Sequence, residues 1–126
     1  MPKTVLETPS APETMAPYSI ATEANGLVFI SGQVGFDPVS GERVPDDVAL
    51  QARQVMDNIG AILGDVGLSY DDIVKTTIFL ASIADFPTVN DVYAGYFDTA
   101  PPARSTIQAG ALPGAFLVEI EVVAAR

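Results

Sequence analysis

The sequence predicts an α+β domain in which two helices pack on one face of a sheet. Two stretches carry apolar residues at three- and four-residue spacing, as amphipathic helices do. Runs rich in β-branched residues, typical of strands, come before, between and after them. Because two helices can cover only one face of such a sheet, the other face is left open. The 126 residues show no internal repeat and fit one domain, residues 1–126.

The first part of the chain indicates two strands and a turn. Residues 1–17 contain four prolines and no periodicity, so we expect an extended start. A short edge strand is predicted over 18–22, after Pro17. A second strand is predicted over 26–31, and its continuous apolar character indicates burial on both faces. Residues 36–42 have the proline and glycine of a turn.

The first helix is predicted from Asp46 to Leu63, where apolar residues form one stripe. Asp46 or Asp47 can cap its start, and Gly64 and Gly67 provide the stop.

The middle of the chain indicates a strand and a second helix. The strand covers 73–80, after a short turn that begins at Asp71. The helix covers 85–97, with Asp85 as its cap and Pro87 in its first turn.

Two extended runs between Pro101 and Ala124, joined by a turn at 112–114, close the chain. Successive side chains of a strand point to opposite faces. One face of the second run is apolar and meets the core: Phe116, Val118, Ile120, Val122 and Ala124. If the two runs pair, the guanidinium of Arg104 and a carboxylate of the second run can lie on one face of the sheet.

The open face of the sheet is expected to carry Leu117 and Val123 beside Thr106, Gln108 and Glu119. Apolar patches on a free surface usually mark an interface. We therefore expect a homo-oligomer with Arg104 at the seam.

The charge balance argues against nucleic-acid and membrane partners. Sixteen acidic residues against six basic ones give a formal net charge of -10. Nucleic-acid affinity depends largely on Lys and Arg that neutralise phosphates, and anionic lipid surfaces attract the same charges. We expect neither partner. The sequence shows no apolar run of membrane-spanning length and no leader-like start, so a cytoplasmic protein is expected.

The chain contains no cysteine and no histidine. Disulfides, thiol nucleophiles and Ser/His or Cys/His nucleophile pairs therefore do not arise from this chain. The carboxylates follow no metal-ligand spacing, so we expect no metal. What remains is an arginine that can grip a carboxylate, a glutamate that can move a proton, and hydroxyl groups: Arg104, Glu119, Tyr18, Ser31, Tyr93 and Thr106.

Each of these residues also has a purely structural interpretation. Arg104 could form a salt bridge with Glu119 or Glu121 at a subunit seam, since charged pairs are often only structural. Glu119 could be a hydrogen-bonded interface residue, and Tyr18 a packing residue. The sequence leaves both interpretations open.

Several fragments of the chain resemble, in order and at compatible spacing, the RidA (YjgF-like) family of reactive-intermediate deaminases. The most specific part runs from Pro102-Ala103-Arg104-Ser105 through Leu112-Pro113 to Val118-Glu119-Ile120. The other fragments are Ala16-Pro17-Tyr18-Ser19, Ile30-Ser31-Gly32-Gln33, Asp85-Phe86, Val89-Asn90 and Tyr93. The resemblance implies a chorismate-mutase-like subunit with a mixed, mostly antiparallel sheet. It also implies a homotrimer around a central barrel, with active sites in the clefts between subunits.

The activity that the resemblance implies is hydrolysis of enamines and imines, such as 2-iminobutanoate and 2-iminopropanoate, to 2-oxo acids and ammonia, without a cofactor. Such intermediates are released by pyridoxal-phosphate enzymes, for example threonine dehydratase. By the same resemblance, Arg104 anchors the substrate carboxylate, Glu119 holds and activates the water, and Tyr18 is a third catalytic residue. The implied cleft lining is Ser31, Gly32, Phe86, Asn90, Thr106 and Pro113.

Two positions depart from the family pattern. Many members have a cysteine where this chain has Thr106, and a glutamine is common where it has Ile20. We expect altered selectivity from Thr106 and a reshaped cleft rim from Ile20. Two other functions stay open: a non-catalytic or chaperone-like trimer that binds small carboxylates, and an endoribonuclease, which the charge balance disfavours.

Overall fold

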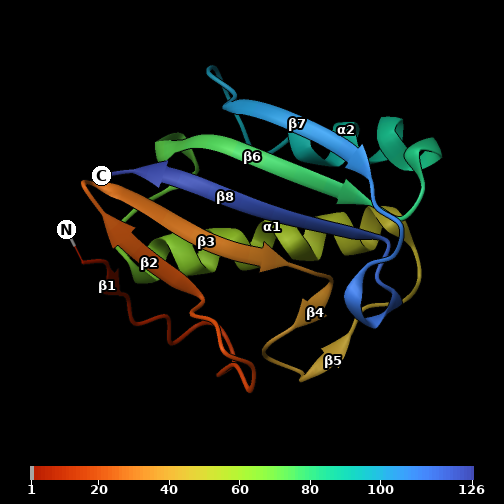
Figure 1. The fold of residues 1–126 in the computed structure, drawn as a ribbon. Helices are drawn as coiled ribbons and strands as arrows, with labels where there is room; N and C mark the ends of the chain where they lie inside the picture. The colour runs from red at the N-terminus through yellow and green to blue at the C-terminus, as the bar shows by residue number, and fades with distance from the viewer. Residues whose placement is uncertain (1) are drawn as a thin grey trace.

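The computed structural model describes residues 2–126, which form a six-stranded sheet with two helices on a single face (Figure 1). The sheet strands are β1 (Thr4–Val5), β2 (Ala21–Ala24), β3 (Leu27–Gln33), β6 (Ile73–Leu80), β7 (Ala103–Gln108) and β8 (Val118–Ala125). The helices are α1 (Val48–Asp65) and α2 (Phe86–Ala94), and a separate hairpin pairs β4 (Phe36–Asp37) with β5 (Glu42–Arg43). The predicted α+β class, with both helices on one face, is confirmed.

The strand order is β1-β2-β3-β8-β6-β7. Within residues 2–126 the β6–β7 pair is parallel, and the other pairs of this sheet are antiparallel. α2 connects β6 to β7, and a crossover of this kind makes the two strands parallel. The two closing runs therefore do not pair with each other, because β6 lies between β7 and β8 (Figure 1).

The second closing run has the two faces that were predicted. Alternate residues of β8 are buried on the helix side: Val118, Ile120, Val122 and Ala124. Glu119 and Val123 consequently lie on the open face. Phe29 pairs with Val123 there and is 43% exposed, so the prediction that residues 26–31 are buried on both faces is wrong for the single chain. Because helices cover one side only, the apolar residues of β3 alternate between buried and exposed.

The first closing run faces the other way. Arg104 is paired with Thr76, which is buried on the helix side. Paired residues of neighbouring strands project from the same face of a sheet. Arg104, Thr106 and Gln108 therefore lie on the helix side, and the expectation that they share the open face with Glu119 is wrong. That expectation required the two closing runs to pair directly.

α1 starts and ends within two residues of the predicted limits. Asp47 caps it by accepting a hydrogen bond from the Leu50 N–H at 3.0 Å. Gly67 follows with a φ of 80°, a conformation that favours glycine after a helix end. The buried stripe of α1 packs on the sheet as predicted: Ala52, Val55, Met56, Ile59, Ile62 and Leu63.

α2 is shorter than predicted, because Tyr96 leaves the helix to pack on Tyr70, with ring centroids 5.3 Å apart. A single 3₁₀ turn, Ile83–Asp85, precedes α2. Ser82, not Asp85, accepts the capping hydrogen bond.

The N-terminal segment adds one strand that was not predicted. β1 pairs with β2 outside it, so β2 is an internal strand and not the edge strand expected over 18–22. β2 also begins later, at Ala21, while Tyr18 stays in the connection before it.

Candidate functional site

Arg104 lies near the start of β7, and its guanidinium group lies over the aromatic rings of α2. The guanidinium carbon is 5.0 Å from the ring centroid of Tyr93 and 5.5 Å from that of Phe86. These two residues share one side of α2 because they are two helical turns apart. The face of an aromatic ring attracts a cation. The rings thus hold the guanidinium while its N–H donors stay available.

Among the residues that the structure describes, no carboxylate forms an ion pair with Arg104. The salt bridge from Arg104 to Glu119 or Glu121, which the sequence left open, is not formed within residues 2–126. The two ion pairs among these residues are Arg43–Asp46 and Arg126–Glu23. The planar fork of donors on Arg104 is therefore available to the carboxylate of a ligand or of another chain.

Two buried polar atoms near Arg104 have no hydrogen-bond partner within residues 2–126: Oδ1 of Asn90 and Oγ1 of Thr106. Thr106 follows Arg104 by two residues on the same side of β7. Asn90 lies on α2 one turn from Phe86 and one turn from Tyr93. An unpaired buried polar atom costs about 1–3 kcal/mol, so these two oxygens are candidates to accept a hydrogen bond from a ligand or a bound water. We call Phe86, Asn90, Tyr93, Arg104 and Thr106 the Arg104 cluster.

Glu119 lies in an open pocket of about 510 Å³ that contains no member of the Arg104 cluster. Four of the predicted site residues surround it, together with three that were not predicted. The pocket is lined by Tyr18, Ser31, Gly32, Val34, Pro113, Gly114, Phe116 and Glu119. We call it the Glu119 pocket.

Gly32 leaves the room that the Glu119 carboxylate occupies. A Cβ atom at Gly32 would lie 2.8 Å from the carboxylate carbon of Glu119, closer than side chains tolerate. The pairing of β3 with β8 shifts register between Ile30 and Gln33. A bulge of this kind bends the strand and is common beside functional sites.

Ser31 and Tyr18 have different roles in this pocket. The Ser31 hydroxyl donates to the Ser19 carbonyl at 2.7 Å, so it ties β3 to the segment that carries Tyr18. The Tyr18 side chain is 55% exposed at the pocket rim. Whether Tyr18 acts at the pocket or packs against another chain stays open, because this exposure is that of the single chain.

The Glu119 carboxyl has an altered acidity. Burial raises its pKa above the usual 4.5, and repulsion from Glu121 on the same strand face raises the pKa further. A carboxylate with a raised pKa is a stronger base.

Elsewhere among residues 2–126, no three His, Cys, Asp or Glu side chains are grouped as metal ligands.

The Arg104 cluster and the Glu119 pocket lie on opposite faces of the sheet in one chain. β6 separates β7 from β8, so the backbones at Arg104 and Glu119 are at least two strand spacings apart, about 9.6 Å. Within one chain, therefore, Arg104 and Glu119 do not face a common space.

Comparison with known proteins decides the family. The family model described as Endoribonuclease L-PSP matches residues 8–126. The chain belongs to the Rid/YjgF family. The resemblance found in the sequence is therefore confirmed.

Rid relatives cover almost the whole chain. Reactive Intermediate Deaminase A, chloroplastic, of Arabidopsis thaliana is 49% identical over 97% of this chain, which spans 65% of that relative's length. The 2-iminobutanoate/2-iminopropanoate deaminase of Bos taurus is 46% identical over 97% of this chain and 89% of its own length. The crystal structure of E. coli TdcF with bound serine is 40% identical, with a TM-score of 0.90 over 98% of both chains.

The cytoplasmic location expected from the sequence stays a prediction for this Rid protein. The Arabidopsis relative is named as chloroplastic. No helix within residues 2–126 combines the length and the apolar character needed to cross a membrane.

Two aromatic residues, Tyr93 and Phe116, lie at the candidate site although the sequence placed both on core faces. Tyr93 has the spacing of a core residue and is 6% exposed, yet its ring lies under Arg104. Its place one turn after Asn90 was the available signal. Phe116 was assigned to the core face of a strand, but it precedes β8 and lines the Glu119 pocket.

Ile20, one of the two departures from the Rid pattern, lies beside the Glu119 pocket and not in it. It lines a neighbouring pocket of about 170 Å³ between residues 10–14 and β3. The two pockets share Tyr18, Gly32 and Val34. The expected effect of Ile20 on the cleft rim stays a prediction. Ile20 would exert this effect indirectly, through Tyr18, which lines both pockets.

Proposed function

We propose that this protein hydrolyses small 2-imino acids and their enamines, such as 2-iminobutanoate and 2-iminopropanoate, to 2-oxo acids and ammonia. The observation that carries the proposal is Arg104, held over two aromatic rings with no carboxylate partner within residues 2–126. Relatives named as 2-iminobutanoate/2-iminopropanoate deaminases are 44–46% identical to this chain. Both support an enzyme that acts on small anionic imines.

Arg104 anchors the substrate carboxylate. Its guanidinium fork matches a carboxylate in a two-pronged, planar geometry. The unpaired oxygens of Asn90 and Thr106 lie in the same cluster and accept hydrogen bonds from the substrate or its water. The aromatic rings of Phe86 and Tyr93 lie against the guanidinium group and fix its plane.

Glu119 positions and activates the water. The water oxygen bonds to the imine carbon while its proton passes to Glu119 and from there to the imine nitrogen. In the resulting carbinolamine the hydroxyl proton passes through Glu119 to the amino nitrogen, the C–N bond breaks, and ammonia leaves as the hydroxyl oxygen becomes the carbonyl of the 2-oxo acid. The raised pKa of Glu119 suits both the acceptance and the return of this proton. Tyr18 lies at the rim, where its hydroxyl can assist these transfers, and the reaction requires no cofactor.

The complete site requires two chains. We propose the homotrimer that the family resemblance implies, with a central barrel of sheets and three clefts. Each cleft joins the Arg104 cluster of one chain to the Glu119 pocket of its neighbour. The separation of the two halves across the sheet supports this arrangement, as does the exposed apolar surface around Phe29 and Ile107 on the open face. Ser31, Gly32 and Pro113 then line the same cleft as Phe86, Asn90 and Thr106.

Two alternatives make different predictions. A binding module would use the same cleft to hold small carboxylates without turnover. An endoribonuclease would need to attract a polyanion, which a formal net charge of -10 opposes. No observation within the described residues favours either over hydrolysis.

The decisive experiment supplies 2-iminobutanoate as it is formed from threonine by a pyridoxal-phosphate dehydratase. The purified protein should accelerate release of ammonia and 2-oxobutanoate. Arg104→Lys keeps the charge but loses the fork, so kcat/KM should fall by roughly tenfold or more. Arg53→Lys, on the exposed side of α1, is the matched control and should behave as the wild type.

No acceleration by the wild type, together with binding of 2-oxobutanoate, would establish the binding module instead. RNA cleavage that survives stringent purification and disappears in Arg104→Ala would establish the nuclease.

A further inference from the structure

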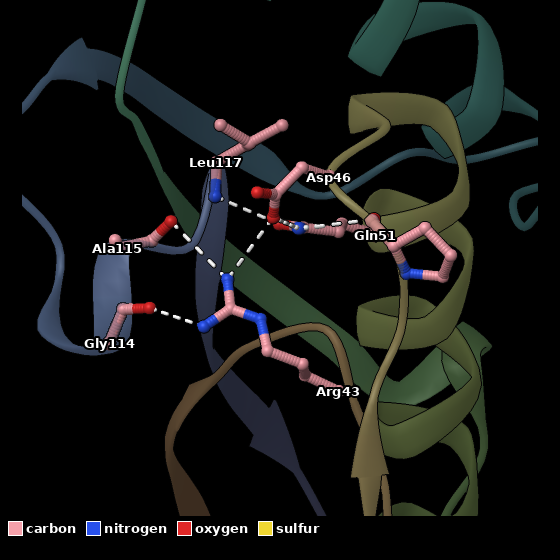
Figure 2. A network of polar contacts seen from close by, with 7 residues as sticks. Arg43, Asp46, Gln51, Gly114, Ala115 and Leu117 are labelled. Carbon is pink, nitrogen blue, oxygen red and sulfur yellow. Dashed lines mark hydrogen bonds and ion pairs between the residues drawn. The ribbon is translucent and has the colours of Figure 1, made fainter.

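The loop that leads into β8 forms one wall of the Glu119 pocket. Pro113, Gly114 and Phe116 line the pocket, and Glu119 follows three residues after Phe116. Side chains from the β4–β5 hairpin and from the start of α1 hold this loop, residues 112–117 (Figure 2).

Arg43, the last residue of β5, grips the loop from one side. Its Nη1 donates to the carbonyl of Gly114, and its Nη2 donates to the carbonyl of Ala115 at 3.4 Å. Its guanidinium carbon lies 4.1 Å from the ring centroid of Phe116. One side chain thus contacts three consecutive residues of the pocket wall.

Gln51 grips the loop from the other side, although it belongs to α1. Its side chain is 0% exposed, and its Oε1 accepts a hydrogen bond from the Leu117 N–H at 2.8 Å. Its Nε2 donates to Oδ1 of Asp46 at 3.3 Å, and the same oxygen accepts from Nη2 of Arg43 at 3.3 Å. Asp46 therefore joins the two grips into one network (Figure 2).

The backbone at Ala115 is strained, whereas Gly114 beside it adopts a positive φ without strain. Gly114 has a φ of 72° and Ala115 a φ of 56°. Alanine rarely adopts a positive φ, and such a conformation persists only where surrounding contacts enforce it. The two carbonyls that Arg43 binds are those of these two residues. The network therefore supplies the contacts that this conformation needs.

We propose that Arg43, Asp46 and Gln51 are positioning residues for the hydrolysis: they hold residues 112–117 in the strained conformation that places Phe116 and Pro113 against Glu119. This inference depends on the proposed function. None of the three lines the Glu119 pocket, so they act through the loop and not on the substrate.

Arg43→Met removes the donors and keeps the length of the stem, so it tests the inference directly. We expect kcat/KM for 2-iminobutanoate to fall by roughly tenfold or more, because small displacements of a pocket wall are costly to catalysis. A loosened wall also admits water to Glu119, so the acid limb of the pH profile should move to lower pH. Arg43→Lys, which can reach one carbonyl, should recover part of the loss. Arg53→Met, on the exposed side of α1, is the matched control.

Amide hydrogen exchange of Leu117 gives a readout that does not depend on turnover, and it should speed up in Arg43→Met and in Gln51→Leu. The inference is overturned if exchange at Leu117 stays at the wild-type rate in both variants. It is also overturned if exchange speeds up while kcat/KM and the pH profile stay unchanged. If the wild type shows no hydrolysis, the proposed function fails. The positioning role is then tested by the binding of 2-oxobutanoate: weaker binding in Arg43→Met supports it, and unchanged binding overturns it.

Discussion

At the scale of single residues, the close contact between Gly32 and the Glu119 carboxylate limits which side chain position 32 can carry. A side chain at position 32 must collide with the carboxylate, as the 2.8 Å approach to the carboxylate carbon shows. Glu119 would then swing away from the water that it is proposed to hold.

Gly32→Ala should therefore lower kcat/KM by roughly tenfold or more while the fold is kept. Gly64→Ala is the matched control, because no atom lies within 4 Å of a Cβ placed at Gly64, inside α1. It should keep full activity and stabilise the fold by about 0.5–1 kcal/mol. Wild-type turnover in Gly32→Ala would show that the close contact has no catalytic meaning.

The acidity of Glu119 predicts opposite effects of pH on activity and on stability. Activity needs the carboxylate, so kcat/KM should rise with pH through the raised pKa of Glu119, above 4.5. Folding favours the protonated form, because a raised pKa means that ionisation opposes the fold. This contribution to stability is complete below pH 4.5 and is lost as pH rises through the folded pKa.

Glu119→Gln cannot ionise and should melt at a higher temperature than the wild type at about pH 7, but not at about pH 4. Thermal unfolding at both pH values, with equal protein concentrations, measures this difference. A variant that melts below the wild type at neutral pH would mean that the ionised carboxylate stabilises the fold.

At the scale of secondary-structure elements, α1 depends on its cap. Asp47→Ala removes the bond to the Leu50 N–H and should destabilise the protein by about 1 kcal/mol. Asp98→Ala removes an equal charge from an exposed position outside the helices and should have little effect. Chemical denaturation of both variants makes the comparison. Equal denaturation midpoints for the two variants would show that the Asp47 cap does not stabilise the fold.

Local patterns predicted the elements well and their pairing poorly. The stripe of α1 and the β-branched run of β6 are properties of neighbouring residues, and both were located almost to the residue. The pairing of β7 with β6 depends on the path of α2, which no periodicity records. The Arg104 cluster was found through motif residues, but the face on which it lies follows from that pairing.

The sequence did not predict the contacts of Arg43 with residues 112–117, for a related reason. Arg43 and Gly114 are 71 positions apart, one at the end of the short strand β5 and the other in the loop before β8. Only the folded chain shows that a hairpin arginine and a helix glutamine meet the same loop.

At the scale of the whole molecule, the subunit has an uncovered sheet face, and the two groups of proposed site residues lie on opposite faces of the sheet. Phe29 is 43% exposed and Ile107 is 49% exposed on the uncovered face. Association through this face would bury them and cover the Glu119 pocket, while Arg104 lies on β7, the edge strand, where a neighbouring chain can also reach it. Light scattering should therefore give the mass of three chains.

The most direct test of the shared cleft mixes two inactive proteins. Arg104→Ala and Glu119→Gln, unfolded together in equal amounts and refolded, should form mixed trimers in which some clefts pair an intact Arg104 with an intact Glu119. Random assortment around a three-fold axis predicts recovery of about a quarter of the wild-type activity. If the mixture stays as inactive as its two parents although mixed trimers form, Arg104 and Glu119 do not act across a subunit boundary, and the account is contradicted.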